Sequence, residues 1–181
     1  PSWSIENELS LDVYGRAVAA AGDVNGDGYG DVLLGSPSFK DGAGDEGRVR
    51  LFYGSGSGFS AKPGWVATGL QAEAQFGSAV AGAGDINRDG YADFLIGAPY
   101  HDVAAGDEGC VFVYYGSAQG PAPKAAGVLN GPEPHGYFGR AVSSAGDVNG
   151  DGFGDFVVGG QSTSDTNKGL LFVYHGAEQW S

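Results

Sequence analysis

Several features are scarce in this chain, and each absence excludes a class of protein. Its 181 residues include one cysteine, Cys110, so no internal disulfide framework is possible, and metal ions remain as a means of stapling a secreted fold. We expect Cys110 to be a small buried apolar group. Only nine Lys and Arg residues are scattered along the chain, which excludes a basic face for nucleic acid.

Long apolar runs and helical periodicity are also missing. No run of 18 apolar residues occurs, so we predict no membrane span. The Ala-rich segment 16–21 is too short for a stable helix. The chain starts at Pro1 without a signal peptide, which favours a processed or excised piece.

Glycine, by contrast, is abundant, with 35 residues, and the apolar runs are short and rich in Val, Phe and Tyr. Turn signals separate these runs, a profile typical of an all-β fold.

One module is written three times. The acidic segment 23–31 (Asp-Val-Asn-Gly-Asp-Gly-Tyr-Gly-Asp) returns after 62 residues as 85–93 and after another 62 as 147–155. An aromatic-Gly pair precedes each copy and a short apolar run ending in Gly closes each unit, with a slip of two residues in the third. A fixed period of this kind indicates an array of supersecondary units, none of which can bury its apolar face alone.

Each acidic segment places oxygen atoms at alternate positions of a tight turn. Such oxygens converge on one point, and a hard cation such as Ca²⁺ takes six to eight of them at about 2.3–2.6 Å. Side chains at positions one, three, five and nine and the backbone carbonyl at position seven are the expected ligands. We therefore predict three Ca²⁺ sites, formed by Asp23, Asn25, Asp27, Tyr29 and Asp31; by Asp85, Asn87, Asp89, Tyr91 and Asp93; and by Asp147, Asn149, Asp151, Phe153 and Asp155.

Other interpretations of the acidic segments fit less well. An EF-hand needs a bidentate Glu at position twelve, where this chain has Leu34, Ile96 and Val158. Zinc would favour His or Cys, and Mg²⁺ a stricter octahedron. A metal-free Asx turn is common for a single Asp-Gly pair, but three full copies at constant spacing argue against it. The net charge of −13 would fall to near −7 with three Ca²⁺ bound.

The second unit carries a recognisable set of elements. It contains Phe76-Gly77, the acidic segment and Gly97-Ala98-Pro99, and it resembles the FG-GAP repeats of integrin α-subunit propellers and of many secreted bacterial proteins. The first unit departs mildly at Tyr14 and Ser36, and the third lacks the proline. The resemblance implies four-stranded antiparallel blades around an axis, calcium between the first two strands of each blade, an extracellular location, and roles in adhesion or ligand binding.

Under this resemblance the whole chain, 1–181, is one repeat domain. Its units cover about 9–70, 71–132 and 133–181, and in the first unit we expect strands around 15–22, 31–36, 48–54 and 64–70. Trp3 lies one repeat before Trp65, so residues 2–8 are predicted to be an outermost strand with no blade of their own, while the third unit stops near Trp180 without one.

Three blades are too few to close a propeller, because propellers typically have four to eight. Two explanations stay open. Either copies associate, with segment 2–8 of one copy completing the third blade of another, in a ring or a filament, or the chain is part of a longer propeller or has lost its partner chain.

For function, we expect a calcium-stabilised structural, adhesion or protein-binding module. Its contact candidates lie in loops 38–47 and 100–109 and are Asp41, Asp45, Glu46, Asp102, Asp107 and Glu108. The alternative is a multivalent lectin in which Trp3, Trp65, Tyr100 and Tyr137 stack on sugars, although the third matching Trp position is Gly127. An enzyme is not expected, because the three His residues do not recur at one position of the repeat.

Overall fold

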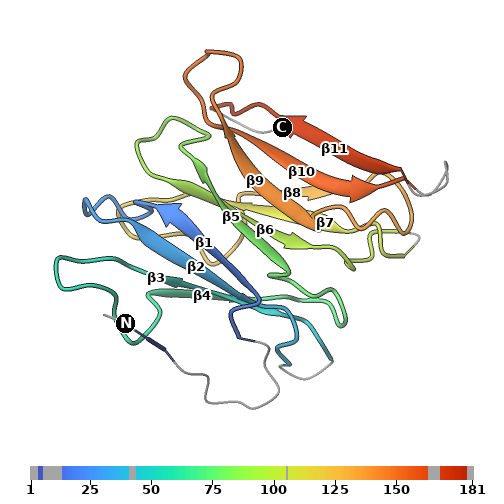
Figure 1. The fold of residues 1–181 in the computed structure, drawn as a ribbon, viewed down its shortest axis with the longest axis horizontal. Helices are drawn as coiled ribbons and strands as arrows, with labels where there is room; N and C mark the ends of the chain where they lie inside the picture. The colour runs from blue at the N-terminus through green and yellow to red at the C-terminus, as the bar shows by residue number, and fades with distance from the viewer. Residues whose placement is uncertain (1–3, 6–13, 41–43, 105, 163–167, 179–181) are drawn as a thin grey trace.

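The computed structural model describes residues 4–5, 14–40, 44–104, 106–162 and 168–178, and it is all β, as the sequence predicts. Three antiparallel sheets follow one another along the chain (Figure 1). We call them blades 1, 2 and 3. Among the described residues, no helix is long and apolar enough to cross a membrane.

Blades 1 and 2 each have four strands in sequence order from the inside out. The strands agree with the expected positions and lie in the same register in both blades. Blade 1 consists of β1 (Ala17–Gly22), β2 (Asp31–Ser36), β3 (Arg48–Phe52) and β4 (Trp65–Thr68), and blade 2 of β5 (Ala79–Gly84), β6 (Asp93–Ala98), β7 (Cys110–Tyr114) and β8 (Gly127–Asn130).

Blade 3 has three described strands, in the order β11-β10-β9. They are β9 (Ala141–Gly146), β10 (Asp155–Gln161) and β11 (Gly169–Tyr174). These three strands correspond to the inner three strands of blades 1 and 2. Of the predicted leading strand 2–8, only Ser4 and Ile5 are described and neither belongs to a strand; the rest of that segment, and Trp180, lie outside the described residues.

The missing proline changes the end of the second strand in blade 3. In blades 1 and 2 this strand ends at Ser36 and Ala98, directly before Pro37 and Pro99, which have no N–H to donate. At the matching position Gln161 pairs with Gly169 and donates its N–H to the Gly136 carbonyl at 2.8 Å. The strand β10 is therefore one residue longer than β2 and β6.

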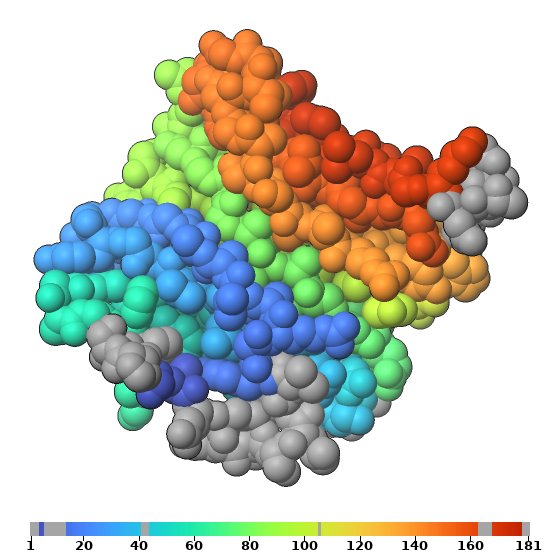
Figure 2. All heavy atoms as spheres, viewed as in Figure 1, coloured from blue at the N-terminus to red at the C-terminus, as the bar shows by residue number. Residues whose placement is uncertain are grey.

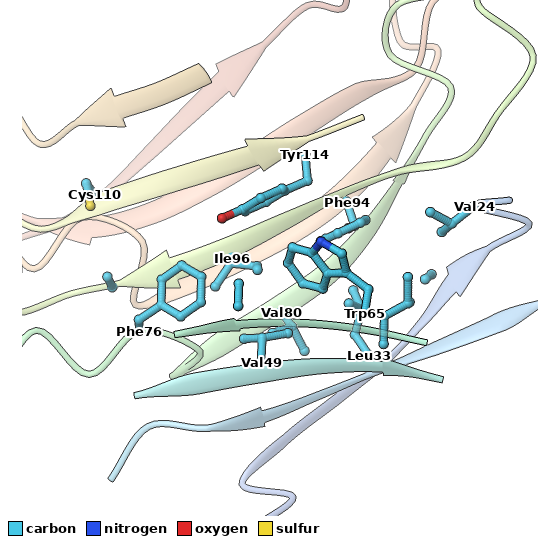
Figure 3. Close-up of a cluster of buried hydrophobic side chains, with 14 residues drawn as sticks. Val24, Leu33, Val49, Trp65, Phe76, Val80, Phe94, Ile96, Cys110 and Tyr114 are labelled. Atoms are coloured by element: carbon cyan, nitrogen blue, oxygen red, sulfur yellow. The ribbon is translucent and has the colours of Figure 1, made fainter. Parts of the chain in front are cut away.

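The blades stack face to face, with the inner strand β5 lying between β1 and β9 (Figures 1 and 2). Between blades 1 and 2, the Phe94 and Tyr114 rings stack at 5.3 Å between centroids, and Trp65 meets both rings edge-on (Figure 3). Leu33 and Val49 of blade 1 are fully buried in the same cluster. Each interface is thus an apolar core shared by two blades, so neither blade can bury its face without the other.

The second interface repeats this arrangement with blade 3. Leu95 and Val111 of blade 2 pack against Phe138, Phe156 and Val158. Cys110 is fully buried, as predicted, and burial raises the pKa of its thiol to about 12, so it is an inert core residue.

Candidate metal centre

The three acidic segments form the connections β1–β2, β5–β6 and β9–β10, each between two antiparallel strands of one blade. We call residues 23–31, 85–93 and 147–155 acidic loops 1, 2 and 3. The hairpin location agrees with the sequence analysis, and the strand that follows each loop rules out the helix of an EF-hand.

The side chains at positions one, three and five of each loop turn toward the loop's own backbone. In acidic loop 1 the Asp27 N–H donates to both Asp23 Oδ1 at 3.0 Å and Asn25 Oδ1 at 3.1 Å. The Gly28 N–H donates to Asp23 Oδ2 at 2.8 Å, and the Tyr29 N–H to Asp27 Oδ1 at 2.9 Å. Because oxygens from two side chains share one donor, they converge on the same side of the turn.

Acidic loops 2 and 3 repeat these bonds almost atom for atom. The Asp89 N–H donates to Asp85 and Asn87, both at 3.0 Å, and the Asp151 N–H donates to Asp147 at 3.1 Å and Asn149 at 3.0 Å. The glycine at position six has a positive φ in all three loops, at 89°, 92° and 87° for Gly28, Gly90 and Gly152. Glycine adopts this backbone without strain, which explains its recurrence.

The aspartate at position nine has a different environment. Asp31 begins β2, is buried, and accepts the Val24 N–H at 2.8 Å and the Gly54 N–H at 2.9 Å. The equivalent residues behave alike: Asp93 accepts from Ile86 and Gly116, and Asp155 accepts from Val148 and Gly176. Each of these carboxylates therefore ties its loop to the end of the third strand of the same blade.

The predicted ligands thus fall into two groups, those that bond their own turn and the position-nine aspartates that bond the third strand. The sequence analysis did not predict this structural role of position nine. The recurring glycines 54, 116 and 176 after each third strand are the sequence signal for it. Within the ranges that the structure describes, no three Asp, Glu, His or Cys side chains come together closely enough to hold a metal.

The electrostatics of position nine differ between the blades. Burial raises the pKa of Asp93 to about 7, against the lowering effect of its two backbone hydrogen bonds, and Asp89 and Asp85 raise it further. Burial likewise raises the pKa of Asp31. For Asp155, burial raises the pKa, but the hydrogen bonds from Val148, Gly176 and His175 outweigh it and the net shift is downward.

The donor set fits Ca²⁺ in its chemistry. All side-chain candidates are carboxylate or amide oxygens, the ligands that a hard cation prefers. A carboxylate offers about four lone-pair sites, so two N–H bonds leave acceptor capacity on the position-nine aspartates. The aspartates, the asparagine and the position-seven carbonyl would hold the ion, which would supply positive charge beside the buried carboxylate at position nine.

Acidic loops 1 and 2 are also fastened to the next blade. The Asp23 carbonyl accepts the Ala92 N–H at 3.0 Å and the Val24 carbonyl accepts the Ser117 N–H at 3.0 Å. The Asp85 and Ile86 carbonyls accept the Gly154 and Ala177 N–H groups, both at 2.9 Å. Acidic loop 3 has no following blade in the described part of the chain, and Val148 is 56% exposed where Val24 and Ile86 are fully buried.

The loops at the opposite end of the blades contain two buried carboxylates among the predicted contact residues. Glu46 and Glu108 are only 6% and 5% exposed. Glu108 accepts the N–H groups of Val103, Ala104 and Gly106 at 2.9–3.1 Å and so shapes its own loop. Asp102 is exposed, Asp45 and Asp107 are partly exposed, and Asp41 lies outside the described residues.

The aromatic residues proposed for sugar stacking are engaged in packing. Trp65 is buried, and its Nε1–H donates to the Ala122 carbonyl at 3.3 Å. Tyr100 and Tyr137 meet edge to face at 5.2 Å, and Trp3 lies outside the described residues. The three His residues have unrelated neighbours: His101 packs on Phe112, while His135 and His175 lie 3.4 Å from Asp107 and Asp155.

Antiparallel blades stacked through shared apolar faces around their inner strands define the β-propeller class. The family model for the FG-GAP repeat matches residues 14–52, 76–114 and 138–174, and the chain belongs to this family.

Similar proteins are integrin α subunits. Integrin alpha-IIb of Mus musculus is 36% identical over 171 residues, which is 91% of this chain and 16% of that protein. Integrin alpha-IIb of Homo sapiens is 36% identical over 162 residues, 86% of this chain and 15% of that protein. Integrin alpha-5 of Xenopus laevis is 32% identical over 186 residues, 97% of this chain and 17% of that protein. The chain therefore spans about a sixth of the length of these curated relatives.

Proposed function

We propose that this chain is a calcium-binding propeller module of an extracellular adhesion or protein-binding protein, in which Ca²⁺ stabilises each blade. The observation that carries the proposal is the threefold repetition of one oxygen-lined turn, in which positions one and three converge on a single N–H. A repeated turn of this kind is expected when each blade needs the same ion.

The relatives support the adhesive part of the proposal. They are integrin α subunits, and similarity to them covers 86–97% of this chain. The weak calcium sites of extracellular modules work at about 10⁻⁴–10⁻³ M Ca²⁺, which fits exposed loops. The module binds rather than catalyses, with the ions in a structural role.

A partner protein would contact the end of the blades opposite the acidic loops. Asp102 and Asp107 lie there on a loop that Glu108 holds from inside. Gln71, which lies between β4 and β5, bonds the Asp102 backbone at 2.6 and 3.1 Å. A loop fixed in this way presents its carboxylates in one geometry, which lowers the entropy cost of binding.

Blade 3 supports the expectation of a partner chain or a second copy. Leu171 and Val173 of β11 are 70% and 51% exposed, although their counterparts Val111 and Val113 of blade 2 are buried. At the other end of the stack, Val18 of β1 is 64% exposed. A second copy that packs its blade 1 on this face, with its segment 2–8 paired along β11, would bury both apolar ends.

Binding of the 181-residue chain to immobilised matrix proteins and to a glycan array, each with 2 mM CaCl₂ or EDTA, tests the proposed activity. We expect calcium-dependent binding to protein and none to glycans. Glycan binding alone would favour the lectin alternative, and hydrolysis of a matrix protein would contradict the binding role. Light scattering with calcium present tests association: a dimer or larger species supports it, and a monomer contradicts it.

A further inference from the structure

The fourth position of acidic loop 2 breaks the repeat. It is Arg88, whereas acidic loops 1 and 3 have Gly26 and Gly150 there. All three positions have a positive φ, at 73°, 59° and 75° for Gly26, Arg88 and Gly150. A residue with a side chain is strained in this region, and strained residues that persist often serve a function.

The contacts of this position show why the two neighbouring loop pairs differ. Between acidic loops 1 and 2, the Tyr91 ring lies on the Gly26 backbone, and a Cβ there would be 2.6 Å from Tyr91 Cε1. Between acidic loops 2 and 3, the counterpart of that ring is Phe153, and the Arg88 Cζ lies 5.1 Å from its centroid.

The guanidinium also reaches the backbone of acidic loop 3. Arg88 Nη1 donates to the Asp151 carbonyl at 3.4 Å. A Cβ at Gly152 would lie 3.2 Å from Arg88 Cζ, so the guanidinium rests directly on that glycine. The Arg88 guanidinium of acidic loop 2 therefore places a permanent positive charge beside acidic loop 3, next to two of its predicted ligands, Asp151 and Phe153.

We propose that Arg88 is an affinity-setting residue that weakens Ca²⁺ binding at acidic loop 3 by placing a guanidinium beside it. This inference rests on the proposed calcium function. In the absence of calcium the guanidinium offsets the mutual repulsion of Asp147 and Asp151. When Ca²⁺ binds, two like-signed charges lie close together, so the guanidinium opposes the ion. Acidic loop 2 receives no such charge from acidic loop 1, because the equivalent position is Gly26, whose backbone contacts the Tyr91 ring.

Three glycine amides allow each loop to be followed separately. The N–H groups of Gly28, Gly90 and Gly152 donate to Asp23, Asp85 and Asp147 at 2.8, 2.9 and 2.9 Å. Their NMR shifts during titration of the whole chain with CaCl₂ give one midpoint for each loop. Arg88→Gln removes the charge, Arg88→Lys keeps it, and Arg140→Gln removes an exposed charge at the far end of β9 as a matched control.

We expect Arg88→Gln to tighten Ca²⁺ binding at Gly152 by about three- to tenfold at low salt, the scale of charges a few ångströms apart near a surface. The gain shrinks in 0.5 M NaCl because salt screens exposed charges. Arg88→Lys and Arg140→Gln should stay within about twofold of the unaltered chain, since neither changes the charge beside acidic loop 3.

An unchanged Gly152 midpoint in Arg88→Gln, with Gly28 still responding normally, would overturn this inference and leave the calcium function intact. Equal shifts in Arg88→Gln and Arg88→Lys would also overturn it, because shape rather than charge would then be responsible. If no glycine responds to CaCl₂ in any variant, the calcium function fails and this inference fails with it.

Discussion

Blades 2 and 3 share the same inner three strands and the same acidic loop, but only blade 2 is covered on both faces by described residues. Ile86, Val111 and Val113 of blade 2 are at most 2% exposed, while their counterparts Val148, Leu171 and Val173 are 51–70% exposed. The local sequence is nearly constant, so the difference comes from the neighbour. In a stacked array, the stability of a unit is largely a property of its interfaces.

The acidic loops follow the same contrast. Acidic loop 2 is fastened to blade 3 by hydrogen bonds to the Asp85 and Ile86 carbonyls. Acidic loop 3 has the same internal bonds but, in the described chain, no blade beyond it. An ion bound at acidic loop 3 should therefore order its own loop more than an ion at acidic loop 2 does. An ion bound at acidic loop 2 should contribute more to the stability of the whole stack.

The largest expected effect is the removal of calcium from all three loops at once. A site with a Kd of about 10⁻⁴ M contributes about 1.8 kcal/mol in 2 mM Ca²⁺, so three sites contribute about 5 kcal/mol. We expect EDTA to lower the melting temperature of the protein in 2 mM CaCl₂ by about 10–20 °C, as measured by calorimetry. An unchanged melting temperature would contradict the calcium dependence of both blades.

Core truncation sharpens the contrast between the two blades. Ile86→Ala removes a fully buried side chain and should cost about 2–4 kcal/mol in urea unfolding. Val148→Ala, at the same position of the exposed loop, should cost less than about 1 kcal/mol when the chain is dilute enough to be monomeric. Similar losses for the two variants under these conditions would contradict the contrast between the two blades.

Glycine substitutions test the close approach of successive blades. A Cβ on Gly97 would collide with the Gly139 carbonyl oxygen, whereas a Cβ on Gly159 meets nothing closer than the Ala141 Cβ at 3.3 Å. We expect Gly97→Ala to destabilise the chain by about 2 kcal/mol and Gly159→Ala by less than about 0.5 kcal/mol in urea unfolding. Comparable effects would contradict the packing described for β6 against blade 3.

Removal of one ligand compares how much the middle site and the terminal site contribute to stability. Asp85→Ala should lower the melting temperature more than Asp147→Ala, by about 5 °C, because acidic loop 2 supports neighbours on both sides. Equal losses would show that the position in the stack does not matter. The matching alanine variants Asn87→Ala and Asn149→Ala, which remove neutral ligands, should show the same order with smaller effects.

The smallest predicted effect concerns His101 on blade 2, which has no counterpart in blade 3. Burial lowers its pKa below 6.5, although Asp102 and Glu108 raise it in part. The unfolded chain therefore binds the proton more readily, so stability is complete above pH 6.5 and falls as the pH drops through that value toward the lower folded pKa. His101→Phe should flatten the fall between pH 7 and 5 in calcium-loaded protein, and an identical pH profile would contradict the burial of this imidazole.

Much of the fold could be predicted because the same module occurs three times, so each copy checks the interpretation of the other two. The constant offset of 23–31, 85–93 and 147–155 predicted the hairpins and the strands around them, including the three described strands of blade 3. The boundaries of the units at 70/71 and 132/133 stay a prediction, as do the fifteen ligands.

Other features depend on contacts between blades that no local pattern encodes. The second role of Asp31, Asp93 and Asp155 requires knowing that the third strand ends beside the loop. Glu46 and Glu108 were expected at a contact surface, but each is buried at the base of its loop. The extension of β10 to Gln161 follows from the missing proline, but it also needs Gly169 as a pairing partner, which the repeat pattern does not reveal.

The number of calcium ions bound by the purified chain decides whether these loops are metal sites, and elemental analysis after equilibrium dialysis in 2 mM CaCl₂ measures it. We expect three ions per chain, and one ion fewer in each of the single variants Asp23→Ala, Asp85→Ala and Asp147→Ala. Calcium-free protein that keeps its full stability would contradict the central claim that these loops are built around a cation.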